Sequence, residues 1–334
     1  MNNKVCKQPI VFVTDDRYSS YQEEEAVLSS VDARLTVLNL SCEEEAVVAL
    51  READGILVNL FPLNARVIDS LDHCRIISRY GVGYDNVDLE AATRKGIWVA
   101  RVPDYATEDV SDHALALLLG CVRKIAYKDH RIRSGAWNMQ KEQPVFRVAG
   151  KTLGLVGFGS IARALHRKIG GFGLGKILVY DPYVPADVIK KEGCVPVTLE
   201  FLLTESDYVS LHIPLSSQTR GLIGQTQIGM MKTSGILINT ARGPVVDEVA
   251  LCRALQTGKL AGAGLDVFEK EPLPDDSPLR KLDNVILSDH NAWYSEESMV
   301  ELKTKAALNV ARVLAGNPPV YPVNFIAQGG DSHA

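Results

Sequence analysis

The chain has 334 residues, of which 46% are hydrophobic and 23% charged, and its formal net charge is −5. These are ordinary values for a globular protein, and the length suits two domains of about 100–200 residues each. The charges are dispersed without a basic block, so neither nucleic acid nor an anionic membrane surface is expected as a partner. No apolar run approaches the roughly 20 residues of a membrane span, and the start of the chain contains no signal-peptide core.

The six cysteines are scattered along the chain, with no Cys-x-x-Cys pair and no histidine at metal-ligand spacing. This pattern indicates reduced thiols and no metal site. A cytoplasmic location is therefore expected, because disulfides form mainly in oxidising compartments.

The first hundred residues alternate short apolar runs with helical stretches, which predicts a parallel sheet covered by helices. Strands are expected at 10–14, 34–38, 55–59, 75–79 and 97–100, and helices at 18–28, 42–53, 65–71 and 87–95. Ser41 and Glu44 are spaced as a capping box for the second helix. The glycine-containing loop at 80–86 follows a strand, so it is expected at the edge where such sheets bind ligands. The alternative is that this loop is a plain strand-to-helix turn with no ligand.

An unusually apolar helix is expected to begin at Thr107 as its N-cap and to continue to Arg133. Its apolar character suits burial either between domains or between subunits. Residues 137–148 have no clear period and are expected to form a connecting loop.

A second alternating series begins at residue 151, with strands expected at 153–156, 177–180, 208–212, 235–239, 263–267 and 285–287. Helices are expected at 160–169, 187–192, 199–204, 225–231, 248–257 and 296–314. Together the two series predict an α/β protein with two doubly wound parallel-sheet domains.

The second series opens on a dinucleotide-binding fingerprint. Gly157 permits a tight turn after the strand, Gly159 lets the backbone approach a pyrophosphate, and Ala162 takes the third position. The helix amides from Ser160 onward face that negative charge. Asp181 lies 24 positions after Gly157, close to the roughly 20 expected for the acid that binds the ribose, and no arginine follows it to accept a 2′-phosphate. The cofactor predicted from these residues is NAD rather than NADP.

Three ionisable residues follow strands of the second series and are candidates for chemistry: Arg242, Glu271 and His290. Each has an ordinary alternative, as a surface ion-pair arginine, an exposed loop acid and a hydrogen-bonded histidine at a strand end. Two further histidines are weaker candidates. His212 could border a nicotinamide or be structural, and His113, within the apolar helix, is expected to be a hydrogen-bonded core residue.

Several short motifs follow one another in the second series: Gly157-Phe-Gly-Ser-Ile-Ala162, Tyr180-Asp-Pro182, Asn239-Thr-Ala-Arg-Gly243, Gly264-Leu-Asp-Val-Phe268, Glu271-Pro272 and His290-Asn-Ala-Trp-Tyr294. In their order and spacing they resemble the D-2-hydroxyacid dehydrogenase family, and the likeness runs from about residue 55 to 315. Within that family the ending is most similar to the C-terminal-binding-protein branch, and the loop at 80–86 is similar to phosphoglycerate dehydrogenases as well.

The resemblance implies a Rossmann NAD domain, residues 104–290, inserted into a flavodoxin-like substrate domain made of residues 1–103 and 291–334. It implies that Arg242 clamps the substrate carboxylate and carbonyl oxygen, that Glu271 pairs with His290, and that His290 exchanges the proton. The amides of Val82 and Gly83 would hold the other side of the carboxylate, and Trp293 could shape the substrate pocket or pack against the final helix. The implied cofactor contacts are Ser160, Ile161, Asp181, Thr240 and Asp266.

The chemistry of these side chains supports the same roles. Reduction of a 2-keto acid needs a hydride at the carbonyl carbon and a proton at its oxygen, and a histidine titrating near its ordinary pKa of about 6.5 can give that proton. A neighbouring carboxylate favours the imidazolium. An arginine grips a carboxylate with two parallel hydrogen bonds and opposes the charge that develops on the carbonyl oxygen.

The expected activity is the NAD-dependent interconversion of a small 2-keto acid, such as glyoxylate or hydroxypyruvate, and its D-2-hydroxy acid, by a homodimer. One alternative is a corepressor-like interaction protein that responds to NAD. The other is D-3-phosphoglycerate dehydrogenase, for which Arg79 and Arg101 are the available cations for a substrate phosphate. The short stretch after the last expected helix leaves no room for an added regulatory domain, which counts against D-3-phosphoglycerate dehydrogenase.

Overall fold

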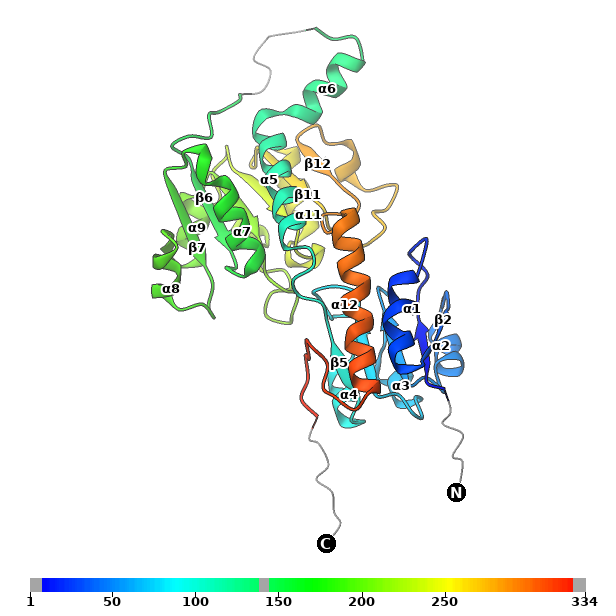
Figure 1. Ribbon diagram of the computed structural model, residues 1–334. Coiled ribbons are helices and arrows are strands. Elements are labelled where there is room, and N and C mark those ends of the chain that lie inside the picture. Colours follow the sequence, from blue (N-terminus) through cyan, green and yellow to red (C-terminus); the bar gives the residue numbers. More distant parts are fainter. Residues whose placement is uncertain (1–7, 138–143, 327–334) are drawn as a thin grey trace, which may run out of the picture. The chain divides into compact units, whose positions relative to one another are not determined.

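The computed structural model describes residues 8–137 and 144–326, which form two compact units (Figure 1). Unit 1 contains the residues up to Tyr105 together with those from Ser295 onward, and unit 2 is Ala106–Tyr294. The expected domain boundaries, after residues 103 and 290, lie two and four residues before these breaks. The stretch 138–143 of the expected connecting loop is outside the described residues.

Unit 1 contains a parallel sheet of five strands in the order β2-β1-β3-β4-β5, which is the flavodoxin-like order. The strands are β1 (Ile10–Val13), β2 (Arg34–Val37), β3 (Gly55–Val58), β4 (Ile76–Arg79) and β5 (Trp98–Ala100). β3 and β4 are buried along their whole length, as expected for central parallel strands covered on both faces.

The helices of unit 1 come from both ends of the chain: α1 (Gln22–Leu28), α2 (Glu43–Ala49), α3 (Ala65–Asp69), α4 (Leu89–Arg94), the 3₁₀ turn η1 (Ser29–Val31) and the C-terminal α12 (Glu296–Leu314). α12 packs against α1, β3 and β4, and it approaches the sheet so closely that a Cβ on Gly55 would lie 2.9 Å from Val310. A strand-to-helix contact this tight requires glycine at that position.

The expected capping box of Ser41 with Glu44 is wrong. Cys42 is the N-cap of α2 in extended backbone, and Glu45 reaches back so that its Oε2 accepts hydrogen bonds from N and Oγ of Ser41, both at 2.9 Å. With the cap one residue later than expected, Glu45 instead of Glu44 stands at the third helical position.

Unit 2 contains a parallel sheet of seven strands in the order β12-β11-β10-β9-β6-β7-β8. The strands are β6 (Thr152–Val156), β7 (Lys176–Tyr180), β8 (Val195–Pro196), β9 (Tyr208–Leu211), β10 (Ile236–Asn239), β11 (Gly262–Leu265) and β12 (Val285–Leu287). This is the Rossmann order extended by one strand, and it reverses between β6 and β9. Ligands of such sheets bind outside the carboxyl ends of the strands at that reversal.

Helices cover both faces of this sheet (Figure 1). α5 (Thr107–Arg123), α7 (Ser160–Ile169) and α8 (Ala186–Lys191) pack their apolar residues with one face, and α9 (Leu199–Glu205), α10 (Gln225–Met230) and α11 (Glu248–Gln256) with the other. Three 3₁₀ turns, η2 (Gly170–Phe172), η3 (Gly243–Val245) and η4 (Pro278–Lys281), lie between these elements.

The single helix expected from Thr107 to Arg133 is two helices, because Lys124 adopts the left-handed conformation with φ of 57° and separates α5 from α6 (Ile125–Arg133). The N-cap of α5 is Ala106, not Thr107. α5 is buried along one face, whereas no residue of α6 is buried and Figure 1 shows α6 leaving the body of unit 2.

Within the described residues, no helix is long and apolar enough to cross a membrane. In the same ranges no cluster of three histidine, cysteine or acidic side chains is arranged to hold a metal ion.

Candidate active site

The side chains expected to carry chemistry in unit 2 follow the carboxyl ends of its strands. Gly157 follows β6, Asp181 follows β7, Arg242 comes after β10, Glu271 is in the loop after β11, and His290 comes after β12. Parallel strands place all these loops at one edge of the sheet, which is the ligand-binding edge of this fold.

Glu271 and His290 form a direct pair. Nδ1 of His290 lies 2.6 Å from Oε2 of Glu271, and Oε1 of Glu271 accepts a hydrogen bond from the Phe268 amide at 3.0 Å. Both side chains are partly exposed, His290 at 27% and Glu271 at 30%. A carboxylate that holds Nδ1–H leaves Nε2 as the ring nitrogen that can exchange a proton with a ligand.

The carboxyl of Glu271 remains charged to lower pH than an ordinary glutamate. Burial raises its pKa, but the hydrogen bond and charge of His290, the Phe268 amide and the charge of Arg242 together outweigh burial, and the net pKa lies below the usual value. The Glu271 side of the pair is therefore an ionised carboxylate at neutral pH.

The backbone that carries Arg242 is fixed on both sides. The Asn239 side chain accepts a hydrogen bond from the Ala241 amide and donates one to the Arg242 carbonyl, both at 3.0 Å. Gly243 is pressed against Phe268, since a Cβ there would lie 1.8 Å from the Phe268 carbonyl oxygen. One guanidinium nitrogen of Arg242 donates to the Ala241 carbonyl at 2.8 Å.

His290 stands in a tightly constrained loop. Its φ is 59°, in the left-handed region that few residues other than glycine and asparagine adopt. Its amide donates to the Asp266 carbonyl at 2.8 Å, and its own carbonyl accepts from the Trp293 indole at 2.9 Å. Trp293 is half-buried and packs edge-to-face on Tyr294, with ring centroids 5.8 Å apart.

The glycine-rich turn has the geometry that a bound dinucleotide needs. Gly157 has φ of 93°, and a Cβ there would lie 2.6 Å from the His212 carbonyl oxygen, so only glycine fits. A Cβ on Gly159 would meet no protein atom within 4 Å, so its side is open to a ligand. Gly159 is also the N-cap of α7 and supplies no capping side chain, which leaves the first-turn amides, from exposed Ser160 and half-buried Ile161, for an anion.

Two further residues at this edge fit a cofactor. Asp181 accepts hydrogen bonds from the amides of Phe158 and Tyr183, each at 2.8 Å, which fixes its carboxylate beside the turn. The Oγ1 atom of Thr240 is buried and has no hydrogen-bond partner within the described part of the chain. A buried polar atom without a partner at a ligand edge is what a missing ligand leaves behind.

Asp266, the remaining predicted cofactor contact, is only 1% exposed, and its carboxylate faces the loop that carries His290. It accepts hydrogen bonds from the amides of Asn291 and Ala292, at 3.1 and 3.0 Å, and from the Ser288 hydroxyl at 2.6 Å. The sequence did not single out Ser288, although it stands directly after β12 and two residues before His290. Whether Asp266 also contacts a cofactor stays a prediction.

The two other histidines have structural partners. His113 on α5 bonds through Nε2 to the Ser288 hydroxyl at 2.8 Å, so it is hydrogen-bonded as expected. Its side chain is 27% exposed, however, so the expected place in the core is wrong. Nε2 of His212 lies 2.9 Å from the Ser210 hydroxyl, and burial lowers the pKa of His212 to about 4. His212 is therefore neutral at physiological pH and is not the proton donor.

Val82 and Gly83 belong to unit 1, in the loop that follows β4. The preceding Gly81 has φ of 135°, and its carbonyl accepts from the Val102 amide at 2.9 Å. Arg101 donates to the Val82 carbonyl at 3.4 Å, and the Arg79 guanidinium fills the space beside Gly81, where a Cβ would lie 1.6 Å from it. Arg101 thus holds the loop by a hydrogen bond, and Arg79 packs beside it, at the carboxyl edge of the sheet of unit 1.

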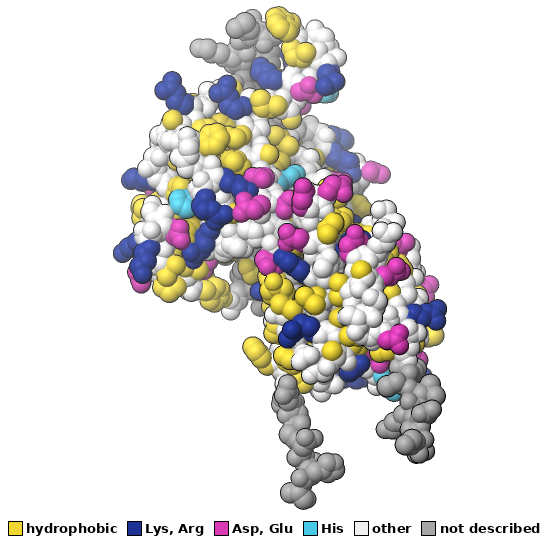
Figure 2. All heavy atoms as spheres, in the orientation of Figure 1, with side chains coloured by type: hydrophobic (Ala, Val, Ile, Leu, Met, Phe, Trp, Pro, Cys, Tyr) yellow, Lys and Arg dark blue, Asp and Glu magenta, His cyan; other side chains and the backbone are white. Residues whose placement is uncertain are grey.

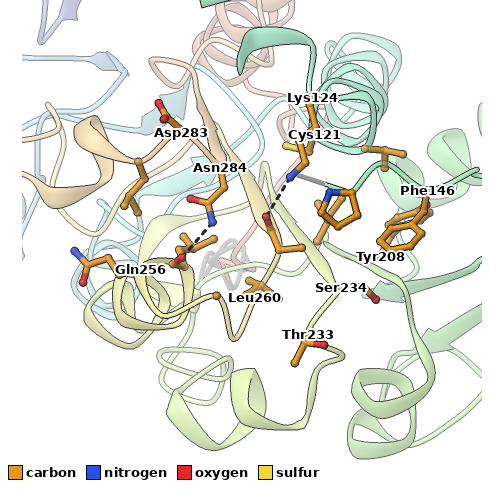
Figure 3. A pocket seen from close by; sticks show the side chains of 17 residues that line it. Cys121, Lys124, Phe146, Tyr208, Thr233, Ser234, Gln256, Leu260, Asp283 and Asn284 are labelled. Carbon is orange, nitrogen blue, oxygen red and sulfur yellow. Dashed lines mark hydrogen bonds between the residues drawn. The ribbon is translucent and has the colours of Figure 1, made fainter. Parts of the chain in front are cut away.

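A cavity of about 600 Å³ lies elsewhere in unit 2, at the amino ends of β9, β10 and β12 (Figure 3). Its walls include Cys121, Lys124, Phe146 and Tyr208, and the Lys124 ammonium donates to the Ala261 carbonyl at 3.5 Å. None of the predicted catalytic or cofactor residues lines it, so it is separate from the ligand edge.

Known proteins resemble this chain in sequence and in structure. Residues 115–292 match the family described as D-isomer specific 2-hydroxyacid dehydrogenase, NAD binding domain. The chain is 43% identical over 266 residues to glyoxylate reductase of Korarchaeum cryptofilum, which covers 79% of this chain and 80% of that one. It is 38% identical over 285 residues to D-3-phosphoglycerate dehydrogenase of Methanocaldococcus jannaschii, covering 85% and 54% of the two chains. D-lactate dehydrogenase from Aquifex aeolicus, solved with NAD and lactic acid, matches with a TM-score of 0.84 at 30% identity, over 92% of this chain and 96% of that one.

Proposed function

Because the chain belongs to the D-isomer specific 2-hydroxyacid dehydrogenase family, we propose that it interconverts a small 2-keto acid of the glyoxylate or hydroxypyruvate type and the corresponding D-2-hydroxy acid, with NAD as cofactor. The observation that carries this proposal is the His290–Glu271 pair at the same sheet edge as the open glycine turn. In this assignment unit 2 is the NAD domain and unit 1 the substrate domain.

The cofactor site consists of residues that follow β6, β7 and β10. The amides of Ser160 and Ile161 bind the pyrophosphate where Gly159 leaves room, and Asp181 accepts hydrogen bonds from the ribose. The hydroxyl of Thr240 gains in the cofactor the partner that it lacks within the described residues. When bound, the reduced cofactor supplies the hydride that the reaction needs.

His290 donates the proton in reduction and accepts it in oxidation. In the direction of reduction its Nε2–H protonates the carbonyl oxygen, while Glu271, bonded to Nδ1, holds the ring in place and balances the charge of the imidazolium. Arg242 grips the substrate carboxylate and opposes the charge on the reacting oxygen. The amides of Val82 and Gly83 hold the other side of that carboxylate.

The two arginines near the loop after β4, Arg79 and Arg101, favour a small substrate over a phosphorylated one. Arg79 is 8% exposed and packs beside Gly81 of the loop, and Arg101 donates to the Val82 carbonyl, so neither guanidinium extends from the protein as an exposed phosphate ligand.

The test is a steady-state comparison of glyoxylate, hydroxypyruvate, phosphohydroxypyruvate and bulkier apolar 2-keto acids with NADH, and again with NADPH. We expect turnover of the first two with NADH, and weaker use of NADPH because no arginine follows Asp181. Absence of turnover across the panel would refute the proposed activity. A clear preference for phosphohydroxypyruvate would replace it with the phosphoglycerate alternative.

We propose further that the active form is a homodimer joined through α6. No residue of this helix is buried, and its side chains Ile125 and Ile132 are 61% and 49% exposed, with Trp137 beyond the helix at 86%. Figure 2 shows hydrophobic side chains on the surface at this end of unit 2. Exposed apolar residues on a helix without an intramolecular partner are typical of a subunit interface.

Sedimentation distinguishes this assembly from a corepressor-like role. Ile125→Glu with Ile132→Glu should yield monomers, whereas Val48→Glu, at an even more exposed apolar site on α2, should leave the assembly unchanged. A dimer that forms only with NAD and shows no turnover would favour the interaction protein. The cytoplasmic location expected from the sequence stays a prediction.

A further inference from the structure

Three side chains from separate parts of unit 2 meet behind the loop that carries His290. Asp266 follows β11, Ser288 follows β12, and His113 lies on α5, which packs over both strands. The Ser288 hydroxyl is 2.6 Å from Oδ1 of Asp266 and 2.8 Å from Nε2 of His113, and Nε2 is also 3.5 Å from Oδ1.

The proton positions in this cluster follow from its chemistry. A carboxylate only accepts hydrogen bonds, so the single hydroxyl proton of Ser288 points to Asp266. His113 must then donate its Nε2–H to the serine oxygen. The order of the three hydrogen-bonded side chains differs from that in a serine hydrolase, in which the histidine lies between the serine and the acid and takes the serine proton. Ser288 is therefore not a nucleophile here.

The Asp266 carboxylate also holds the backbone of the loop. Oδ1, which accepts from Ser288, accepts from the amide of Asn291 as well, and Oδ2 accepts from the amide of Ala292. The Asp266 carbonyl accepts from the amide of His290. Asp266 thus fixes three consecutive amides, the first of them on a residue with φ of 59°. A left-handed histidine persists only where its surroundings hold it.

We propose that Asp266, Ser288 and His113 are positioning residues, which hold residues 288–292 in the one backbone conformation that directs Nε2 of His290 to the substrate. This inference rests on the proposed function of His290. The serine is the link through which α5 braces the loop, so removing its hydroxyl frees the carboxylate to rotate away from the amides of Asn291 and Ala292.

The test compares Ser288→Ala with Ser288→Thr, which restores a hydroxyl, and with the matched control Ser210→Ala. Ser210, on β9, is likewise bonded to a histidine nitrogen; it is buried whereas Ser288 is half-buried, and it has no hydrogen bond to the loop among the described residues. We expect kcat to fall about 10- to 100-fold in Ser288→Ala, as for a small misplacement of a catalytic group. Ser288→Thr should recover most of the activity.

A second pair of variants tests the helix side of the network. His113→Gln retains a donor and should stay active, while His113→Leu should lose activity as Ser288→Ala does. Equal losses of kcat in Ser288→Ala and Ser210→Ala, or a loss that only follows a lower melting temperature, would show a merely structural role and overturn the proposal.

Amide hydrogen exchange separates this inference from the proposed function. In Ser288→Ala the amides of Asn291 and Ala292 should exchange at least about tenfold faster than in the unmodified protein, and in Ser210→Ala they should not. Unchanged exchange overturns the network even in an active enzyme. Faster exchange in a protein without turnover on any keto acid would support the network and reject only the proposed reaction.

Discussion

Nδ1 of His290 lies 2.6 Å from Oε2 of Glu271, across 19 positions of sequence. The contact joins the loop after β11 to the loop after β12, which are neighbouring parallel strands, so the sheet itself brings the two side chains together. It also fixes which ring nitrogen is committed to the protein and which one can reach a ligand.

Replacement of His290 should remove chemistry without removing the cofactor. His290→Gln lacks a group that can give a proton near neutral pH, so turnover should fall by at least about 100-fold. His290→Asn should behave alike, and asparagine tolerates the left-handed backbone at this position better. NADH binding, followed by fluorescence titration, should stay nearly intact in both; equal loss of binding and turnover would show that His290 is structural.

The lowered pKa of Glu271 predicts an acid-dependent contribution to stability. A carboxyl whose pKa is depressed on folding stabilises the protein above its ordinary pKa, and that stabilisation is lost as pH falls through the folded value. The unmodified protein should therefore have a larger free energy of unfolding than Glu271→Gln. This difference should be greatest above a pH of about 5 and should decrease as the pH falls below about 4.5. Urea unfolding at pH 6 and pH 3.5 measures it, and a difference that grows toward acid pH would contradict the assignment.

Gly159→Ala should separate folding from cofactor binding. A Cβ at this position meets no protein atom within 4 Å, so the free energy of unfolding should change by less than about 0.5 kcal/mol. The same Cβ enters the space through which the pyrophosphate approaches, and NADH affinity should fall at least about tenfold. Gly171→Ala, which is equally open but lies outside the turn, is the control and should alter neither quantity.

Lys303 on α12 should be essential to the stability of unit 1. Its side chain is 5% exposed and pairs with Glu23 and with Glu24, whose Oε2 is 3.6 Å away and whose side chain is fully buried. Lys303→Met leaves these carboxylates without their cation and should lower the free energy of unfolding by about 3–5 kcal/mol. Lys305→Met removes a more exposed ion-pair lysine of the same helix and should lower it by only about 0–1 kcal/mol.

The pKa of Glu24 gives this cluster a second test. Burial raises it above the ordinary value, although the Tyr80 hydroxyl and Lys303 oppose the shift, so the charged form is disfavoured in the folded protein. Glu24→Gln added to Lys303→Met should therefore recover part of the lost stability at neutral pH, and the recovery should fade as pH falls and the glutamate becomes protonated. No recovery at pH 7 would show that the cost lies in packing instead of charge.

The sequence predicted the five strands of unit 1 and six of the seven strands of unit 2, because these are short apolar runs. It missed the edge strand β8, which has two residues, Val195 and Pro196, and so forms no apolar run. The family resemblance indicated Arg242, Glu271 and His290 by motif. The sequence pattern could not predict that Lys124 divides α5 from α6, because lysine has no preference for the left-handed conformation found there. The sequence pattern also did not indicate the hydrogen bond between Ser288 and His113, which are 175 positions apart. A hydrogen bond between distant segments leaves no periodic pattern, so only the folded chain reveals it.

The return of α12 to the sheet of unit 1 has a consequence for synthesis on the ribosome. Unit 2 is one uninterrupted stretch, complete once residue 294 has emerged, whereas the first hundred residues must wait for the last helix before β3 and β4 are covered and Glu24 meets its lysine. The nascent chain can thus complete unit 2 first, and unit 1, although it contains the earlier residues, is the last to become native.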